Sequence, residues 1–173
     1  MPSSQKFSYY VIFMALVFGS SQCLAKSESR LGLDSKVAIT DDVHALAVVA
    51  LKNNSPIVVL LERSDCDYCK TINREFISPL STASRYQGKV FFTRVSLDEG
   101  EVIKGFDRRL IPTVQFGAFY DAEFSPTILF LDGEGSQISD KLVGLANIDF
   151  YGFYLEQGIK ESIDKLRSNS DGY

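Results

Sequence analysis

The stretch IVVLLERSDCDYCKTI, residues 57–72, decides the fold. Residues 57–61 form a continuous run of aliphatic, mostly β-branched side chains, which is typical of a strand covered on both faces. A short polar turn separates this run from Cys66, and apolar residues recur at helical spacing after Cys69. The stretch therefore predicts a buried strand, a turn and a helix, with the cysteine pair where the helix begins.

Outside this stretch, strands alternate with helices and a hairpin comes near the end. Helical patterns cover residues 41–51, 69–77, 78–86, 112–121 and 147–166, and strand patterns cover 57–61, 90–97, 127–131 and 137–143. Ser78-Pro79 has the form of an N-cap and first position of a new helix, and residues 98–109 are charged and loop-like. The order predicts an α/β fold in which helices flank a mixed central sheet.

Length and composition fit one globular domain. The chain has 173 residues, of which 45% are hydrophobic and 23% are charged, and its formal net charge is −4. These values are ordinary for a globular protein and argue against a disordered or fibrous chain. The acidic balance counts against nucleic acid as a partner.

The first 25 residues have the order of a secretory signal peptide. Lys6 is followed by the apolar run 9–18 and then by small or neutral residues up to Ala25. An uncleaved membrane anchor is the alternative. A lipid-anchored form is disfavoured because Gln22, not a small residue, precedes Cys23.

After cleavage at Ala25, the remaining chain would have three parts. We expect a flexible leader at residues 26–40, one domain at 41–168 and a disordered tail at 169–173. The mature protein would then be periplasmic or otherwise exported, without stable insertion in a membrane.

The two remaining cysteines, Cys66 and Cys69, carry the chemistry. At the start of a helix, free backbone N–H groups and the helix dipole favour a negative sulfur at Cys66. Cys69 lies one turn further in, where it is suited to resolve a mixed disulfide. A Cys66–Cys69 disulfide closes almost no loop and therefore stabilises the fold little by loop entropy. Reactivity is the favoured interpretation, and a passive disulfide remains an alternative.

A zinc site is the other alternative. A single CxxC lacks a second pair of ligands, and the only histidine, His44, lies far upstream. We expect no metal and no other cofactor.

A buried strand is followed by CxxC, a helix, a strand and then Ser125-Pro126-Thr127 before an apolar strand. This order resembles that of the thioredoxin-fold thiol–disulfide oxidoreductases. The resemblance covers roughly residues 41–167 and implies a three-layer sandwich. It looks closest to periplasmic thioredoxin-like proteins, including those associated with sulfur oxidation. It implies that Cys66 and Cys69 are catalytic.

The resemblance also implies a cis-proline beside the cysteines. We choose Pro126 over Pro112, because an apolar run follows Pro126 whereas a helical pattern follows Pro112. The cis bond would expose the backbone of Ser125 to an extended substrate, so that Ser125, Pro126 and Thr127 would bind it. An edge-strand breaker is the alternative role for Pro126.

Several residues depart from the family's pattern and bear on redox tuning. The family's tryptophan before the first cysteine is replaced by Asp65, and its buried acid by Leu60. Glu62 would replace that acid only if its side chain turned toward Cys69; otherwise it is a surface residue. Arg94 stands where thioredoxins place a lysine, and would either stabilise a thiolate or face solvent.

Of the two residues between the cysteines, Asp67 points to a reductase, whereas Tyr68 is similar to the tyrosine often found there in exported isomerase-type enzymes. Asp67 is negative and close to Cys66, so it should disfavour the thiolate and make the reduced protein the better reductant. Tyr68 offers a flat contact for a peptide substrate.

These observations favour an exported reductase of protein disulfides that is recharged by a membrane thiol electron donor. The alternatives are an oxidase or isomerase, and a binding module whose disulfide is structural. Aromatic residues would serve such a module if they were exposed, but we expect them in the core: Phe116, Phe119, Tyr120, Phe124, Tyr151, Phe153 and Tyr154.

Overall fold

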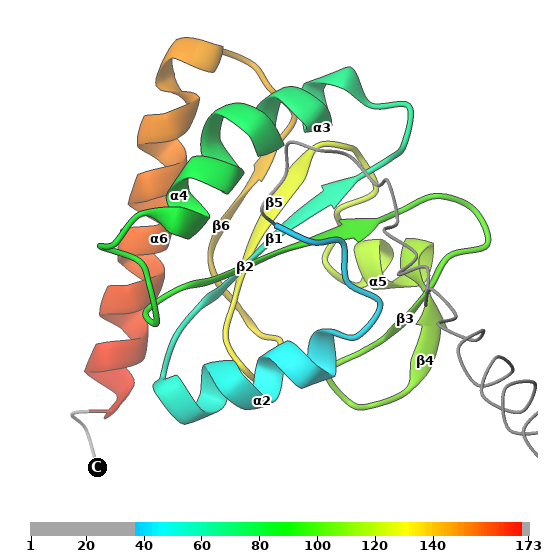
Figure 1. The fold of residues 1–173 in the computed structure, drawn as a ribbon. Coiled ribbons are helices and arrows are strands. Elements are labelled where there is room, and N and C mark those ends of the chain that lie inside the picture. The colour runs from blue at the N-terminus through cyan, green and yellow to red at the C-terminus, as the bar shows by residue number, and fades with distance from the viewer. Residues whose placement is uncertain (1–36, 171–173) are drawn as a thin grey trace, which may run out of the picture. The chain divides into compact units, whose positions relative to one another are not determined.

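The computed structural model describes residues 37–170 (Figure 1). Its helices are α2 (Val43–Asn53), α3 (Asp67–Ile72), a π-helical segment (Asn73–Ile77), α4 (Ser78–Thr82), α5 (Thr113–Phe119) and α6 (Ile148–Ser170). Its strands are β1 (Ile57–Glu62), β2 (Phe91–Ser96), β3 (Val102–Lys104), β4 (Leu110–Pro112), β5 (Thr127–Leu131) and β6 (Gln137–Val143). The predicted signal peptide, most of the predicted leader and the end of the tail lie outside the described residues.

A mixed sheet of four strands, in the order β2-β1-β5-β6, forms the centre of the fold. Strand β1 pairs in parallel with β2 and antiparallel with β5, and β5 pairs antiparallel with β6. Helices α2 and α5 lie on one face of the sheet, and α3, α4 and α6 lie on the other (Figure 1). The predicted architecture, a mixed sheet flanked by helices, is confirmed.

Strand β1 is buried along its whole length and contributes side chains to the hydrophobic cores on both faces of the sheet. Ile57, Val59 and Leu61 enter the core under α2 and α5. Val58 and Leu60 enter the core under α3, α4 and α6. A strand covered on both faces has no solvated side, so its sequence is a continuous apolar run instead of an alternating one.

Helix α6 packs very close to the sheet. Its buried stripe includes Tyr151, Leu155 and Ile159. Gly158 lies in the same stripe, and a Cβ atom placed there would come within 2.4 Å of the Phe130 ring. Only glycine therefore lets α6 approach β5 this closely. No helix between residues 37 and 170 has the length and apolar character needed to cross a membrane.

The helix predicted to begin at Ser78 does not begin there. Ser78 has ordinary helical backbone angles, and its N–H donates to the carbonyl of Asn73, five residues back. Pro79 has no N–H and its ring crowds the carbonyl four residues earlier, and a π-helical turn is one way to carry a helix past such a residue. The helical run thus continues from Asp67 to Thr82 and ends before the predicted limit at residue 86.

Two segments carry more structure than the sequence indicates. Residues 98–109, predicted as a loop, contain β3, which pairs with β4 in a separate two-stranded sheet. Val37 and Ile39 fall within the predicted leader, yet Val37 is buried and Ile39 bridges to Arg94 of β2.

Candidate functional site

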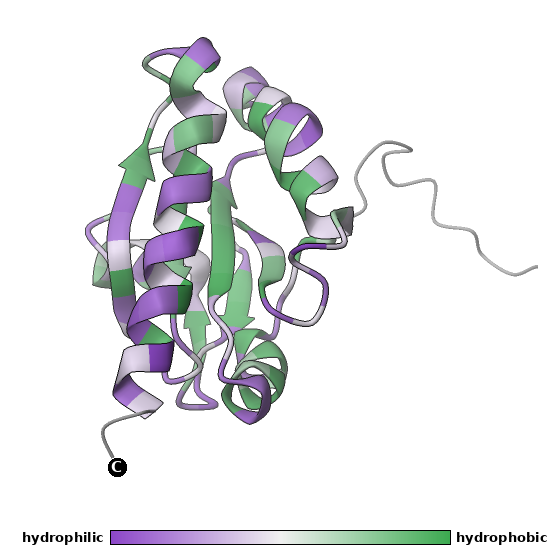
Figure 2. Ribbon diagram, turned by 90° about the vertical axis from the view of Figure 1, so that its left-hand side faces the viewer, coloured by the Kyte–Doolittle hydropathy of each residue, from purple (hydrophilic) through white to green (hydrophobic). Residues whose placement is uncertain are grey.

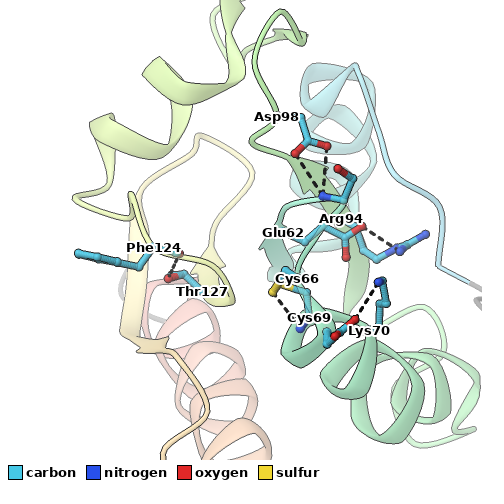
Figure 3. Close-up of a disulfide and its surroundings, with 10 residues drawn as sticks. Glu62, Cys66, Cys69, Lys70, Arg94, Asp98, Phe124 and Thr127 are labelled. Atoms are coloured by element: carbon cyan, nitrogen blue, oxygen red, sulfur yellow. Dashed lines mark hydrogen bonds and ion pairs between the residues drawn. A yellow bond between two sulfur atoms is a disulfide. The ribbon is translucent and has the colours of Figure 1, made fainter.

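The Cys66–Cys69 disulfide lies where β1 gives way to α3 (Figure 3). Cys66 is the N-cap of α3, with an extended backbone, and its Sγ accepts a hydrogen bond from the Cys69 N–H at 3.1 Å. A backbone amide that is free at a helix start therefore points at this sulfur. Cys66 is half-buried, whereas Cys69 is only 1% exposed. The arrangement gives one sulfur that a partner can reach and one sulfur behind it.

The turn before Cys66 is held by the end of the neighbouring strand. Both carboxylate oxygens of Asp98 accept from the Ser64 N–H, at 3.1 and 3.2 Å, and the Ser96 hydroxyl donates to the same carboxylate at 2.9 Å. Arg63 adds a bond from its Nη1 to the Leu97 carbonyl at 2.9 Å. The Ser64 backbone N–H, above all, holds the pKa of Asp98 below its usual range.

Sequence reasoning missed Asp98, which it assigned to a charged loop. The signal available was its position directly after the predicted strand 90–97, which the structure places beside the cysteine-bearing strand β1. An acid at the carboxyl end of such a strand can reach the turn that follows the next parallel strand.

The Ser125–Pro126 peptide bond is cis. Strand register pairs Leu61 with Thr127, so this bond lies at the same edge of the sheet as the turn that leads to Cys66. The Thr127 hydroxyl donates to the Phe124 carbonyl at 2.8 Å and closes the turn around the cis bond (Figure 3). Pro112, the other candidate proline, ends β4 directly before α5.

The Ser125 hydroxyl is a buried polar atom beside the cis bond. Within residues 37–170 its Oγ finds no hydrogen-bond partner. Buried polar atoms are usually paired, and an orphan hydroxyl costs about 1–3 kcal/mol.

Glu62 is buried on the face of the sheet that α3 covers. It is two residues from Leu60 on the same strand, so both side chains point to that face. The Glu62 Oε1 accepts from the Arg94 Nη1 at 3.0 Å, and its carboxylate is directed to Arg94 (Figure 3). Burial raises the pKa of Glu62, and the charge of Arg94 offsets part of this rise.

Arg94 holds two partners at once. Besides Glu62, its Nε donates to the Val37 carbonyl at 2.8 Å. Its side chain is 17% exposed. The guanidinium therefore joins the acid on β1 to the segment that runs beside β2, and it does not face open solvent.

The two residues between the cysteines are exposed. Asp67 forms an ion pair with Lys70 at 2.9 Å, and this hydrogen bond holds the pKa of the Asp67 carboxyl below its usual range. Tyr68 is 65% exposed. Its ring is thus available to a partner that approaches Cys66.

Metal-ligating side chains do not gather anywhere in residues 37–170: no group of three or more histidine, cysteine, aspartate or glutamate residues there could hold an ion. The histidine, His44, contacts the Phe106 carbonyl and the Arg108 Nε, at 3.1 Å each.

Comparison with known proteins places residues 43–158 in the family described as "Thioredoxin-like domain". Among solved structures, a thioredoxin from Malassezia sympodialis is similar, with a TM-score of 0.51 and 19% identity over 79% of this chain and 98% of that chain. Mitochondrial thioredoxin 3 from Saccharomyces cerevisiae matches with a TM-score of 0.48 and 20% identity over 72% and 94% of the two chains. No curated protein matches the sequence.

Proposed function

The chain belongs to the thioredoxin-like domain family, and from this premise we propose that it is an exported reductase of protein disulfides. A thioredoxin-like fold with a CxxC disulfide supports thiol–disulfide oxidoreductase chemistry. The observation that carries the proposal is the position of Cys66, half-buried at a helix start with a backbone N–H directed at its sulfur.

In the first step, the Cys66 thiolate of the reduced protein attacks one sulfur of a substrate disulfide. A bond forms between Cys66 Sγ and that sulfur, the substrate S–S bond breaks, and the other substrate sulfur leaves as a thiolate. An ordinary thiol with a pKa of about 8.5 is only a few per cent ionised at pH 7. The Cys69 N–H and the other amides of the first helical turn favour the ionised sulfur.

In the second step, Cys69 attacks the Sγ of Cys66. The Cys66–Cys69 disulfide forms, and the remaining substrate sulfur is released, so that two electrons have passed from the protein to the substrate. Cys69 must lose its proton for this attack. Glu62, a carboxylate with a raised pKa on the face covered by α3, is the acid that we propose tunes this step together with Arg94.

The substrate chain would bind across the cis-proline segment. An extended chain can pair with free backbone groups as an added strand. We propose that the backbone of Ser125 offers such groups, that Pro126 and Thr127 hold the segment in place, and that Tyr68 contacts the substrate from the other side. The pairing of Thr127 with Leu61, at the end of β1 that leads to Cys66, supports this placement.

The reducing direction is supported by Asp67. Its lowered pKa keeps it ionised at neutral pH, and a negative charge beside Cys66 disfavours the thiolate. Lys70 offsets part of that charge, so the contribution is small. Export is supported by the signal-peptide pattern in residues 1–25, and the periplasmic subgroup that includes sulfur-oxidation proteins is proposed from sequence resemblance. A membrane thiol donor would return the electrons.

Insulin reduction and the reduction potential test this proposal together. We expect the wild type to reduce insulin disulfides with dithiothreitol as donor, and Cys66→Ser to lose the activity. Cys69→Ser should instead accumulate a mixed disulfide with its substrate, because the resolving sulfur is absent. Ser81→Ala, a change outside the site, is the matched control.

Two results would contradict the proposal. Full activity in Cys66→Ser would remove that sulfur from the mechanism. A reduction potential near −120 mV, the value of strong oxidants, would leave an oxidoreductase but reverse the direction.

A further inference from the structure

Helix α6 exposes two different kinds of side chain along its length. Near its start, Phe150, Phe153 and Tyr154 are 58%, 65% and 55% exposed, so the expectation that Phe153 and Tyr154 lie in the core is wrong. From residue 156 onward its exposed positions are polar, and they include Glu156, Gln157, Lys160, Glu161, Asp164 and Lys165. Figure 2 shows hydrophobic segments in the first turns of α6 and mainly hydrophilic ones toward its end. A solvated helix face is normally polar, so the aromatic first turns need another explanation.

These aromatic residues lie beside the end of β6. Together with Val143, which is 51% exposed, Phe150 and Tyr154 line a cavity of about 420 Å³ between β6 and α6. The charged residue that lines it, Lys141, donates from its Nζ to the Tyr120 carbonyl at 2.6 Å. We call Val143, Phe150, Phe153 and Tyr154 the aromatic patch. It offers apolar surface and fits an apolar side chain better than a charged one.

The aromatic patch is continuous with the cis-proline segment. Register aligns Leu61, Thr127 and Val143 across three neighbouring strands, so β1 ends, β5 begins and β6 ends at one edge of the sheet. The Gly144 N–H donates to the Pro126 carbonyl at 2.7 Å and joins the two segments directly. The end of β1, the cis bond and the aromatic patch therefore follow one another along this edge.

Resting on the proposed function, we infer that the aromatic patch binds an apolar or aromatic side chain of the same polypeptide whose disulfide Cys66 attacks. Two strand spacings separate β1 from β6, which is about 10 Å. An extended chain covers that distance in about three residues. The side chain that enters the cavity therefore lies about three residues from the substrate cysteine.

Matched disulfide peptides test this inference. Two extended peptides would be compared that differ only at the positions three residues before and three residues after the cysteine. Both positions are phenylalanine in one peptide and serine in the other. Oxidised glutathione serves as a small disulfide. We expect the wild type to prefer the phenylalanine peptide by about tenfold in kcat/KM, since a large apolar side chain leaves water. Phe150→Ser should lose the preference but still reduce oxidised glutathione.

Controls separate failure of the inference from failure of the proposed function. Leu110→Ser changes an exposed apolar residue on β4, outside the patch, and should keep the full preference. A wild type that reduces neither peptide nor oxidised glutathione would overturn the proposed function itself. A wild type that reduces all three substrates without preference would overturn only the patch.

Two further measurements test for misfolding of a variant and for self-association of the chain. Tyr154→Ser provides a second patch variant, and its circular dichroism spectrum is compared with that of Phe150→Ser, so that a variant that fails to fold is replaced by the other. Sedimentation tests for a second copy on this face. A dimer that Phe150→Ser dissociates, without any peptide preference, would overturn the inference in favour of self-association.

Discussion

Two ion pairs lie near the disulfide. Their charged atoms are almost equally far apart, but their side chains differ in burial. The Arg94 Nη1 and the Glu62 Oε1 are 3.0 Å apart, and the Lys70 Nζ and the Asp67 Oδ1 are 2.9 Å apart. The first pair is buried, with side chains 17% and 11% exposed, whereas those of the second pair are 61% and 93% exposed. The pKa of Glu62 is raised by burial, and that of Asp67 is lowered by its hydrogen bond to Lys70.

The difference shows that the burial of an ion pair, more than the distance between its charged atoms, determines its effect on pKa and stability. An exposed pair is screened by water and contributes about 0–1 kcal/mol to stability. A buried pair costs free energy to desolvate, and it becomes strongly destabilising when one partner is removed. The four predictions below test this contrast around the cysteines, from the largest expected effect to the smallest.

Removing Arg94 should have the largest effect. Arg94→Met keeps an apolar stem but leaves Glu62 buried without its cation, and we expect a loss of about 3–5 kcal/mol in the free energy of unfolding. Lys70→Met, the matched change in the exposed pair, should cost less than about 1 kcal/mol. Urea denaturation of both variants measures the difference.

A double variant shows whether the unpaired charge is the cause. Glu62→Leu combined with Arg94→Met leaves no buried charge, so it should recover most of the lost stability. Equal losses in the two single variants, Arg94→Met and Lys70→Met, would contradict the contrast between the pairs.

The turn before Cys66 is the next target. Asp98→Ala removes the acceptor of the Ser64 N–H, and we expect a loss of about 1 kcal/mol in stability, because this N–H lies near solvent. The attack of Cys66 on a small disulfide should also slow, since the turn that positions it is looser. Stopped-flow measurement with the reduced protein gives this rate. Asp140→Ala, an exposed acid on β6, is the control, and an equal slowing there would contradict a positioning role.

Much of this site could be predicted from sequence because its elements are locally encoded. The continuous apolar run at 57–61 indicates a strand buried on both faces, and the helical spacing after Cys69 places Cys66 at a helix start. Both conclusions hold in the structure because burial on two faces and a helix N-terminus each leave a pattern within a few residues.

Contacts between distant segments could not be predicted in this way. The sequence does not decide whether Glu62 is buried or exposed, because its burial depends on Arg94 and on the segment at Val37, which are far away in sequence. Asp98 holds Ser64 across a separation of 34 residues. The prediction that a helix starts at Ser78 was wrong, because a π-helical turn carries the helix past Pro79. Nothing in the local sequence pattern distinguishes that turn from a new N-cap.

The buried acid should also give stability a pH dependence that the exposed acid does not. The raised pKa of Glu62 means that the folded protein holds its proton more tightly than the unfolded chain does. Stability therefore falls as pH rises from about 4.5, the ordinary value, through the folded pKa. One proton limits this slope to about 1.4 kcal/mol per pH unit.

Glu62→Gln removes this titration, so the difference in stability between wild type and variant should change with pH above about 4.5. Asp67→Asn should show no change in that range, because the pKa of Asp67 is lowered and its stabilisation is lost only as pH falls. Urea midpoints measured from pH 4 to 8 give both differences, and a constant difference for Glu62→Gln would show that the acid does not titrate there.

The smallest effect should be that of Asp67 on the reduction potential. Asp67→Asn removes a negative charge next to Cys66, which stabilises the thiolate and hence the reduced protein, so the potential becomes more oxidising. Because Asp67 is exposed and already paired with Lys70, the shift should stay below about 10 mV. Lys70→Met should move the potential in the opposite direction, and Glu75→Gln, a surface acid further along the helix, should leave it unchanged. Equilibration with a glutathione redox buffer measures all three variants, and a reducing shift in Asp67→Asn would show that this charge does not act through the Cys66 thiolate.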